Sequence, residues 1–245
     1  MSPPSTPKGA GCVSENVPAA VPVARSPIEP APPEVVVAGW AVSGRRSDAP
    51  LTITDCTPLA KVTLRAPPDG ALAGDLGVPF GRARRSTPVA DLDVLLVGRG
   101  PGEWLALGPP DAAASLVDWL EHAVSRRPHE FGTVVDVTHS RALLRLTGAR
   151  AADLLARECA VDLSDPACPD GTALRSDVSG VAADVVRDDR GAAPSHLIHC
   201  EWSVGRYLFE SLLDGGAEFG VDVDGFGDQD GFGNQDGLGN RPVTA

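Results

Sequence analysis

Alternating and helically spaced apolar residues divide the chain into a patterned middle and two ends without such a pattern. Runs in which every second residue is apolar predict strands, whereas apolar residues three and four positions apart predict helices. The predicted strands cover residues 51–64 (interrupted at Pro58), 92–97, 103–107, 131–137, 142–146, 173–186 and 195–200. The predicted helices cover a segment capped by Asp111 that ends before Pro128, residues 149–158 and residues 204–213.

The order of these elements predicts the fold class. Strands and helices follow one another without the strict βαβ alternation that is typical of a parallel sheet. We therefore expect an α+β domain with a mainly antiparallel sheet and packed helices. Residues 92–97 and 103–107 should form a hairpin, and the polar turn at 187–191 should separate the last two strands.

Both ends of the chain have a composition that is typical of disorder. Residues 1–50 are rich in proline. Their one apolar run, VVVAGW at 35–40, is interpreted as a hydrophobic part of the tail, which could also add a strand or dock on a partner. Residues 223–245 contain six-residue repeats such as DGFGDQ, whose glycines oppose a packed element and whose period differs from that of calcium-binding β-helices. We expect one domain at 51–222 between two disordered tails.

Charge and cysteine content exclude several classes of protein. Acidic side chains outnumber basic ones by 33 to 21, giving a net charge of −12 that would repel nucleic acid. No run approaches the roughly 18 apolar residues of a membrane span, and the first residues lack the order of a secretory signal, so we expect a soluble cytoplasmic protein. The absence of CxxC pairs indicates reduced, partly buried thiols rather than disulfides or zinc. The cysteines are Cys12, Cys56, Cys159, Cys168 and Cys200.

Two short motifs resemble catalytic or nucleotide-binding sites but are better explained structurally. Gly98, Gly100 and Gly102 could approach a phosphate, but a strand pattern follows them where a phosphate loop needs a helix, so we interpret them as a turn. Asp136, His139 and Ser140 have the residue types of a hydrolytic triad, yet on an extended segment Asp136 and His139 point to opposite faces. We expect no catalytic residue in either motif.

Histidines and clustered carboxylates supply the remaining candidate chemistry. His196, His199 and Cys200 would share one face of a helix, but their segment has a strand pattern, in which His196 and Cys200 lie roughly 13 Å apart, too far to bind one metal ion. The acidic clusters at 162–170 and 184–189 are flanked by loop residues, so we interpret them as solvated turns rather than acid–base pairs. No metal site is expected.

Three segments in the same order resemble the gamma subunit family of heterotetrameric sarcosine oxidase, which is related to the folate-binding fold of the aminomethyltransferases. The segments are GPGEWLALGP at 100–109, VVDVTHSRALLRLTGARAADLLA at 134–156 and WSVGRYLFESLLDGGAEFG at 202–220. With a weaker match at 51–64, the resemblance spans about residues 51–222. The 172–188 region fits the family pattern poorly.

The resemblance implies an accessory chain in an assembly with alpha, beta and delta subunits. The assembly oxidises the N-methyl group of sarcosine, giving glycine and hydrogen peroxide and passing the one-carbon unit to tetrahydrofolate. FAD, FMN, NAD, tetrahydrofolate and zinc would lie on the other subunits, and this chain would bind no cofactor itself. A permanent subunit should expose apolar surface and be poorly soluble alone.

The alternative implied by the same resemblance is a stand-alone domain that binds folate or acts as an interaction module. The glycine-glycine-aspartate-type segment of the aminomethyltransferases is not found here. Asp136 and Arg141 fall near the central strands of that fold and are the only candidate folate-binding residues. Their structural explanation is a strand-end carboxylate paired with a nearby guanidinium.

Overall fold

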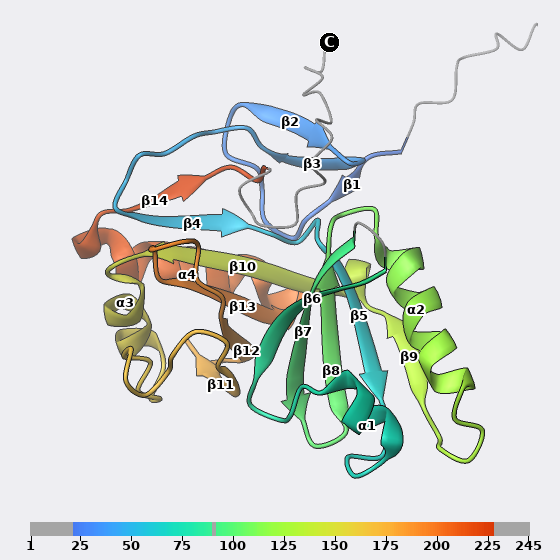
Figure 1. Cartoon of the computed structure of the whole chain (residues 1–245). Coiled ribbons are helices and arrows are strands. Elements are labelled where there is room, and N and C mark those ends of the chain that lie inside the picture. Colours follow the sequence, from blue (N-terminus) through green and yellow to red (C-terminus); the bar gives the residue numbers. More distant parts are fainter. Residues whose placement is uncertain (1–21, 90–91, 228–245) are drawn as a thin grey trace, which may run out of the picture.

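The computed structural model describes residues 22–89 and 92–227 and shows three β-sheets and four α-helices in that part of the chain (Figure 1). Two of the sheets are large and face each other through an apolar layer, and the third is a small sheet near the N-terminus. The predicted α+β class with mainly antiparallel strands is confirmed.

The five-stranded sheet is antiparallel throughout and has the strand order β6-β7-β8-β5-β9. Its strands are β5 (Ala60–Arg65), β6 (Ala83–Val89), β7 (Leu92–Gly100), β8 (Glu103–Gly108) and β9 (Thr133–Asp136). The predicted hairpin is β7–β8, and its turn contains Gly102 at a φ of 70°, a conformation that favours glycine. The interpretation of the three glycines as a turn is confirmed at Gly102, whereas Gly98 and Gly100 belong to β7 and pair with β8.

The six-stranded sheet has the order β11-β12-β13-β10-β4-β14, and all neighbours are antiparallel except β4 and β14. Its strands are β4 (Leu51–Asp55), β10 (Arg141–Gly148), β11 (Ala173–Val178), β12 (Val181–Arg187), β13 (Ser195–Glu201) and β14 (Val221–Asp224). Residues 173–186, expected as one strand, form the β11–β12 hairpin because Ser179 and Gly180 take positive φ values and reverse the chain. This is the poorly fitting 172–188 region.

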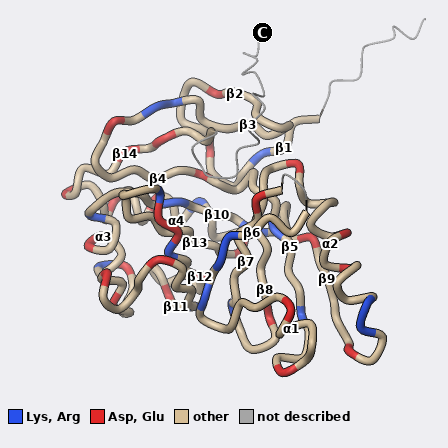
Figure 2. Tube along the Cα trace, in the orientation of Figure 1, with Lys and Arg blue, Asp and Glu red and all other residues tan. Residues whose placement is uncertain are grey.

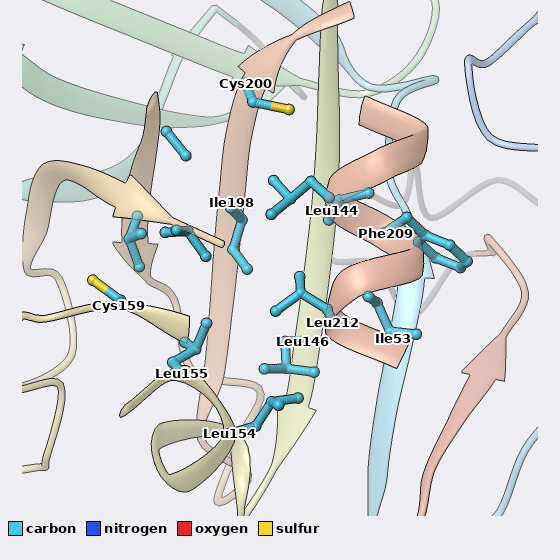
Figure 3. Packing of buried hydrophobic residues seen from close by; sticks show 14 of the residues in the cluster. Ile53, Leu144, Leu146, Leu154, Leu155, Cys159, Ile198, Cys200, Phe209 and Leu212 are labelled. Atoms are coloured by element: carbon cyan, nitrogen blue, oxygen red, sulfur yellow. The ribbon is translucent and has the colours of Figure 1, made fainter. Parts of the chain in front are cut away.

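Each large sheet has its outer face covered by two helices. Helices α1 (Ala71–Leu76) and α2 (Ala113–Ser125) bury leucines on the five-stranded sheet, and α3 (Ala151–Glu158) and α4 (Gly205–Gly216) do so on the six-stranded sheet. Figure 3 shows Leu154 and Leu212 from these helices against strand residues Leu146 and Ile198. The layers are therefore helix, sheet, sheet and helix, with the inner faces of both sheets in contact.

The N-terminal segment from residue 22 onward differs from the predicted tail. It contains β1 (Ala24–Arg25), β2 (Glu34–Val37) and β3 (Trp40–Ser43), which form the third sheet. Trp40 and Val42 are only 5% and 3% exposed because they join the apolar layer between the large sheets. The apolar run at 35–40 thus belongs to the domain, whereas residues 1–21 lie outside the described part.

Other boundaries also differ from the predictions. Asp111 does not cap α2, whose N-cap is Ala112 without a side-chain hydrogen bond. Helix α4 continues through Gly216, and the chain beyond it adds β14 and buries Phe226, so the described part of the predicted 223–245 tail is ordered up to residue 227. Residues 228–245 lie outside the described part.

Within residues 22–89 and 92–227, none of the helices combines the length and apolar character that a membrane span requires.

Candidate functional site

Two buried clusters of arginine and aspartate connect the inner faces of the large sheets. One is centred on Asp184 in β12 and the other on Asp188, just after β12, and these two residues are 3% and 5% exposed. The prediction of a solvated turn at 184–189 is therefore wrong. The reason is that arginines from several distant strands supply counter-charges, without which buried carboxylates would be too costly.

The Asp184 cluster holds two guanidinium groups and an imidazole. Arg99 Nη2 lies 2.9 Å from Asp184 Oδ2, Arg175 Nε lies 3.0 Å from Oδ1, and His199 Nδ1 lies 2.9 Å from Oδ2. Burial raises the pKa of Asp184, but its bond with His199 and the nearby arginine charges outweigh this and lower its pKa below the usual value. Burial lowers the pKa of His199, so a neutral ring donates its Nδ1–H to the ionised carboxylate.

A β-bulge directs Arg99 into this cluster. In the β7–β8 ladder Gly98 pairs with Trp104 and Gly100 pairs with Glu103, so Arg99 is an extra residue on β7 without an opposite partner. Bulges reorient side chains locally. The Arg99 side chain, only 8% exposed, consequently bridges from the five-stranded sheet to Asp184 in the six-stranded sheet.

The Asp188 cluster joins the same two sheets at another level. Arg85 in β6 donates from Nε and Nη2 to the two Asp188 oxygens at 2.9 and 2.8 Å, and Arg145 in β10 donates from Nη2 at 2.8 Å. Arg190 Nη2 lies 3.6 Å away. Burial raises the pKa of Asp188, but the Arg85 hydrogen bond and the charges of all three arginines outweigh it and lower the pKa. Figure 2 shows the basic run on β6 in blue.

Lys61 is fully buried in β5 and faces the same inter-sheet layer. Its Nζ donates to the carbonyl oxygens of Thr57 and Leu59 at 2.6 and 2.7 Å, which fixes the loop between β4 and β5. Burial lowers the Lys61 pKa to about 7, although the charges of Asp55, Cys56 and Asp136 oppose this.

A pocket of about 370 Å³ opens beside the Asp184 cluster at one end of the five-stranded sheet. It contains three arginines, one carboxylate, and apolar and hydroxyl side chains. Its lining includes Thr63, Arg65, Arg99, Glu103, Trp104, Phe131, Val135 and Arg141. This arrangement suits a small ligand, because charged groups and an apolar wall converge on one hollow.

The two residues predicted as folate-binding candidates do not form one site. Asp136 ends β9 and its Oδ1 accepts a hydrogen bond from the Thr138 amide at 2.8 Å, whereas Arg141 begins β10 and ion-pairs with Glu201. Arg141 lines the 370 Å³ pocket, and Asp136 lines a different one near Trp40. The carboxylate and the guanidinium are each paired, but not with each other.

The other candidate motifs have structural roles. His139 stacks on Trp40 with ring centroids 4.8 Å apart, while the Ser140 hydroxyl donates to the Val137 carbonyl, so Asp136, His139 and Ser140 form no triad. His196, His199 and Cys200 lie in a strand, as predicted, and the described residues contain no cluster of three or more metal-ligating side chains.

The thiols and the other acidic cluster agree with the interpretation from sequence. Within the described chain the cysteines are buried and form no disulfide, and Cys12 lies outside it. The aspartates of the 162–170 cluster are exposed in a loop between α3 and β11. These are Asp162, Asp165 and Asp170.

Sequence reasoning missed the charged layer between the sheets. One signal was available at Arg145, which lies within the predicted strand 142–146, because an arginine in a strand must find a partner if its face is buried. Arg85 and Arg99 lay outside the predicted strands. Which strands supply the carboxylates could not be read from the sequence, since Arg85 and Asp188 are 103 residues apart.

Comparisons with known proteins identify the fold. No protein-family model matches the sequence, and a search of curated proteins finds no match. A solved chain of the heterotetrameric sarcosine oxidase from Corynebacterium sp. U-96, in complex with pyrrole 2-carboxylate, matches with a TM-score of 0.57 and 22% identity, over 72% of this chain and 89% of that one. The glycine cleavage system aminomethyltransferase T from Bartonella henselae matches with a TM-score of 0.62 and 16% identity, over 78% of this chain and 55% of that one. The chain thus spans about half the length of the aminomethyltransferase, and it has the fold that these two proteins share.

Proposed function

We propose that this chain is the gamma subunit of a heterotetrameric sarcosine oxidase and acts as an accessory chain of that complex. The observation that carries the proposal is the extent of the structural match, which covers 89% of the Corynebacterium chain but only 55% of the aminomethyltransferase. A chain that matches one subunit nearly from end to end is more simply a counterpart of that subunit than a fragment of a larger enzyme.

In this proposal the chemistry belongs to the other chains. An alpha chain holds NAD and tetrahydrofolate, a beta chain holds FAD and FMN, a delta chain holds zinc, and this chain positions them in the cytoplasm without a cofactor of its own. The buried arginine–aspartate clusters support a structural role because their charges pair with each other across the two sheets.

Exposed apolar side chains are consistent with a partner surface. Permanent subunits bury such residues against one another, so an isolated subunit shows them at its surface. In the described part of the chain the exposed large apolar residues are Val23, Phe80, Val89, Phe131, Val135, Val161 and Tyr207.

The experiment is co-expression of this chain with candidate alpha, beta and delta chains from the same genome, followed by purification through a tag on this chain. We expect a yellow complex with flavin absorbance and sarcosine-dependent peroxide formation. The matched control is co-expression of the other three chains alone, purified through a tag on the alpha chain in both preparations, which should give less assembled complex. Recovery of this chain alone as a colourless, monodisperse monomer would contradict the proposal and favour a free-standing interaction module.

The folate-binding alternative gains no support at its candidate residues. Asp136 and Arg141 line different pockets and bind different neighbours, so they provide no shared site for one ligand.

A further inference from the structure

Arg99 is a buried guanidinium whose hydrogen-bonding capacity is only partly used. Its side chain is 92% buried, since 8% is exposed, and Nη2 pairs with Asp184 at 2.9 Å. Its Nε is fully buried and has no hydrogen-bond partner among the residues that the structure describes. A buried donor left without a partner destabilises the folded chain. Because Arg99 also lines the 370 Å³ pocket, a hydrogen-bond acceptor bound in that pocket would lie beside the Arg99 side chain.

The charges around Arg99 leave a surplus of one positive charge. Four guanidinium groups are paired with three carboxylates in and next to the pocket, whereas the whole chain has a net charge of −12. The pairs are Arg65 with Glu103, Arg141 with Glu201, and both Arg99 and Arg175 with Asp184. A ligand with a single negative charge would balance this local excess.

The apolar side chains that line the pocket favour a ligand with an apolar part. Phe131 is 81% exposed and Val135 is 47% exposed, and both line the pocket together with Trp104. An apolar ligand that covers side chains this exposed would remove their surface from water, which favours binding. The volume lies in the range of small-molecule sites, which is about 300–1,000 Å³.

We propose that this pocket binds a small organic monocarboxylate, with the carboxylate between Arg99 and Arg141 and the apolar body against Phe131 and Val135. A bidentate carboxylate matches the planar fork of a guanidinium. Inorganic phosphate is a poorer fit because it has no apolar body and carries more negative charge than the site requires. The bulge at Arg99 explains why the sheet presents this side chain to the pocket.

The test is titration of the full chain with benzoate, with the neutral isostere benzamide as a matched ligand. Isothermal titration calorimetry and the fluorescence of tryptophan report binding, since Trp104 lines the pocket. We expect saturable benzoate binding with a Kd that is millimolar or tighter and benzamide binding at least tenfold weaker. Phosphate at equal ionic strength should not compete.

Two variants locate the site. Arg141→Met removes one guanidinium whose ion-pair partner, Glu201, is 61% exposed, so the fold should be retained and benzoate should bind at least tenfold more weakly. Arg82→Met removes an exposed arginine outside the pocket and should bind benzoate like the unmodified chain.

Any of three results would overturn the proposal. These are the absence of saturable benzoate binding, benzamide binding as tight as that of benzoate, and equal loss of benzoate affinity in Arg141→Met and Arg82→Met. Subunit assembly is measured separately by co-purification, so this proposal and the proposed function can fail independently.

Discussion

Asp188→Asn is expected to destabilise the fold strongly because it removes a buried charge without changing side-chain shape. The Asp188 side chain is 6% exposed and accepts hydrogen bonds from Arg85 in one large sheet and Arg145 in the other. Asparagine keeps the volume but loses the negative charge and directs an amide N–H toward cationic groups on one side. The inter-sheet contact would then bring positive charges together without their shared carboxylate.

The loss of unfolding free energy depends on which counter-charges the arginines retain in the variant. Arg85 keeps an ion pair with Asp93 at 2.7 Å and is 30% exposed, so its charge remains compensated. Arg145 is 2% exposed, and its remaining acceptors in the described chain are neutral: the Ser195 hydroxyl at 2.8 Å and the Asp188 carbonyl at 3.2 Å. Arg190 is 20% exposed, so solvent partly screens its charge. The variant therefore leaves Arg145 as a buried cation without a counter-charge, a change that costs about 3–5 kcal/mol when one partner of a buried pair is removed.

The assay is urea unfolding with linear extrapolation, comparing Asp188→Asn with Asp165→Asn. Asp165 is a matched control because its side chain is 76% exposed, so loss of its ion pair with Arg187 should cost less than about 1 kcal/mol. The m-value should stay constant, which shows that the same surface is exposed on unfolding. The double variant Asp188→Asn/Arg145→Met should lose less stability than the two single variants summed, because it leaves no unpaired buried charge.

The dependence on pH provides a second check. Because the pKa of Asp188 is lowered in the folded chain, its stabilisation is complete above the unfolded pKa of about 3.9 and is lost as the pH falls through the folded pKa. The difference in unfolding free energy between the native chain and Asp188→Asn should shrink below about pH 4. A cost below about 1 kcal/mol at neutral pH, or full additivity in the double variant, would refute the argument that a shared counter-charge holds the sheets together.

Three further predictions concern other buried positions. The Lys61 pKa falls from 10.5 to about 7 on folding, so the unfolded chain binds more protons than the folded chain between these pH values. The free energy of unfolding should therefore rise with pH in this range, by at most about 1.4 kcal/mol per pH unit. Urea unfolding followed by circular dichroism should show this rise in the native chain and not in Lys61→Met. Trp40→Ala should cost about 3–5 kcal/mol in the same assay, and a loss near zero would contradict the placement of the N-terminal strands in the domain. Gly148→Ala should yield little folded protein, because the φ of Gly148 is 140° and an added Cβ would lie 2.1 Å from the Pro50 carbonyl oxygen. Near-native solubility and thermal stability of this variant would disprove the prediction.

Much of the secondary structure of the middle region could be predicted from the sequence because its signals are local. The hairpin of β7 and β8, helix α3 and the strand at β13 follow from periodicity, turn glycines and apolar spacing within a few residues. Predictions failed where tertiary contacts override local composition. Helix α1 has six residues and β6 carries the sequence ARRSTPV, so neither shows a clear apolar period. Helix α1 is stabilised by burial of its leucines on the sheet, and β6 by its pairing with β7.

The candidate site was less predictable than the fold. Arg141 was named from the sequence and does line the pocket, whereas Asp136 lies at another one. Arg99 was overlooked because it appeared only as a polar residue among turn glycines, and its orientation depends on a bulge that forms when β7 pairs with β8. Pairing register is a property of two strands and cannot be read from either one alone.

The sequence alone therefore determined the α+β class, the succession of most elements between residues 51 and 222, and a net charge of −12, because periodicity and composition act over short distances. The tertiary structure decided that residues 22–50 join the domain, that Asp184 and Asp188 are buried rather than solvated, and that a pocket collects three arginines. These features depend on contacts between strands far apart in the chain. Whether a proline-rich segment is ordered, or a carboxylate can be buried, is set by the apolar surface and counter-charges that distant residues provide.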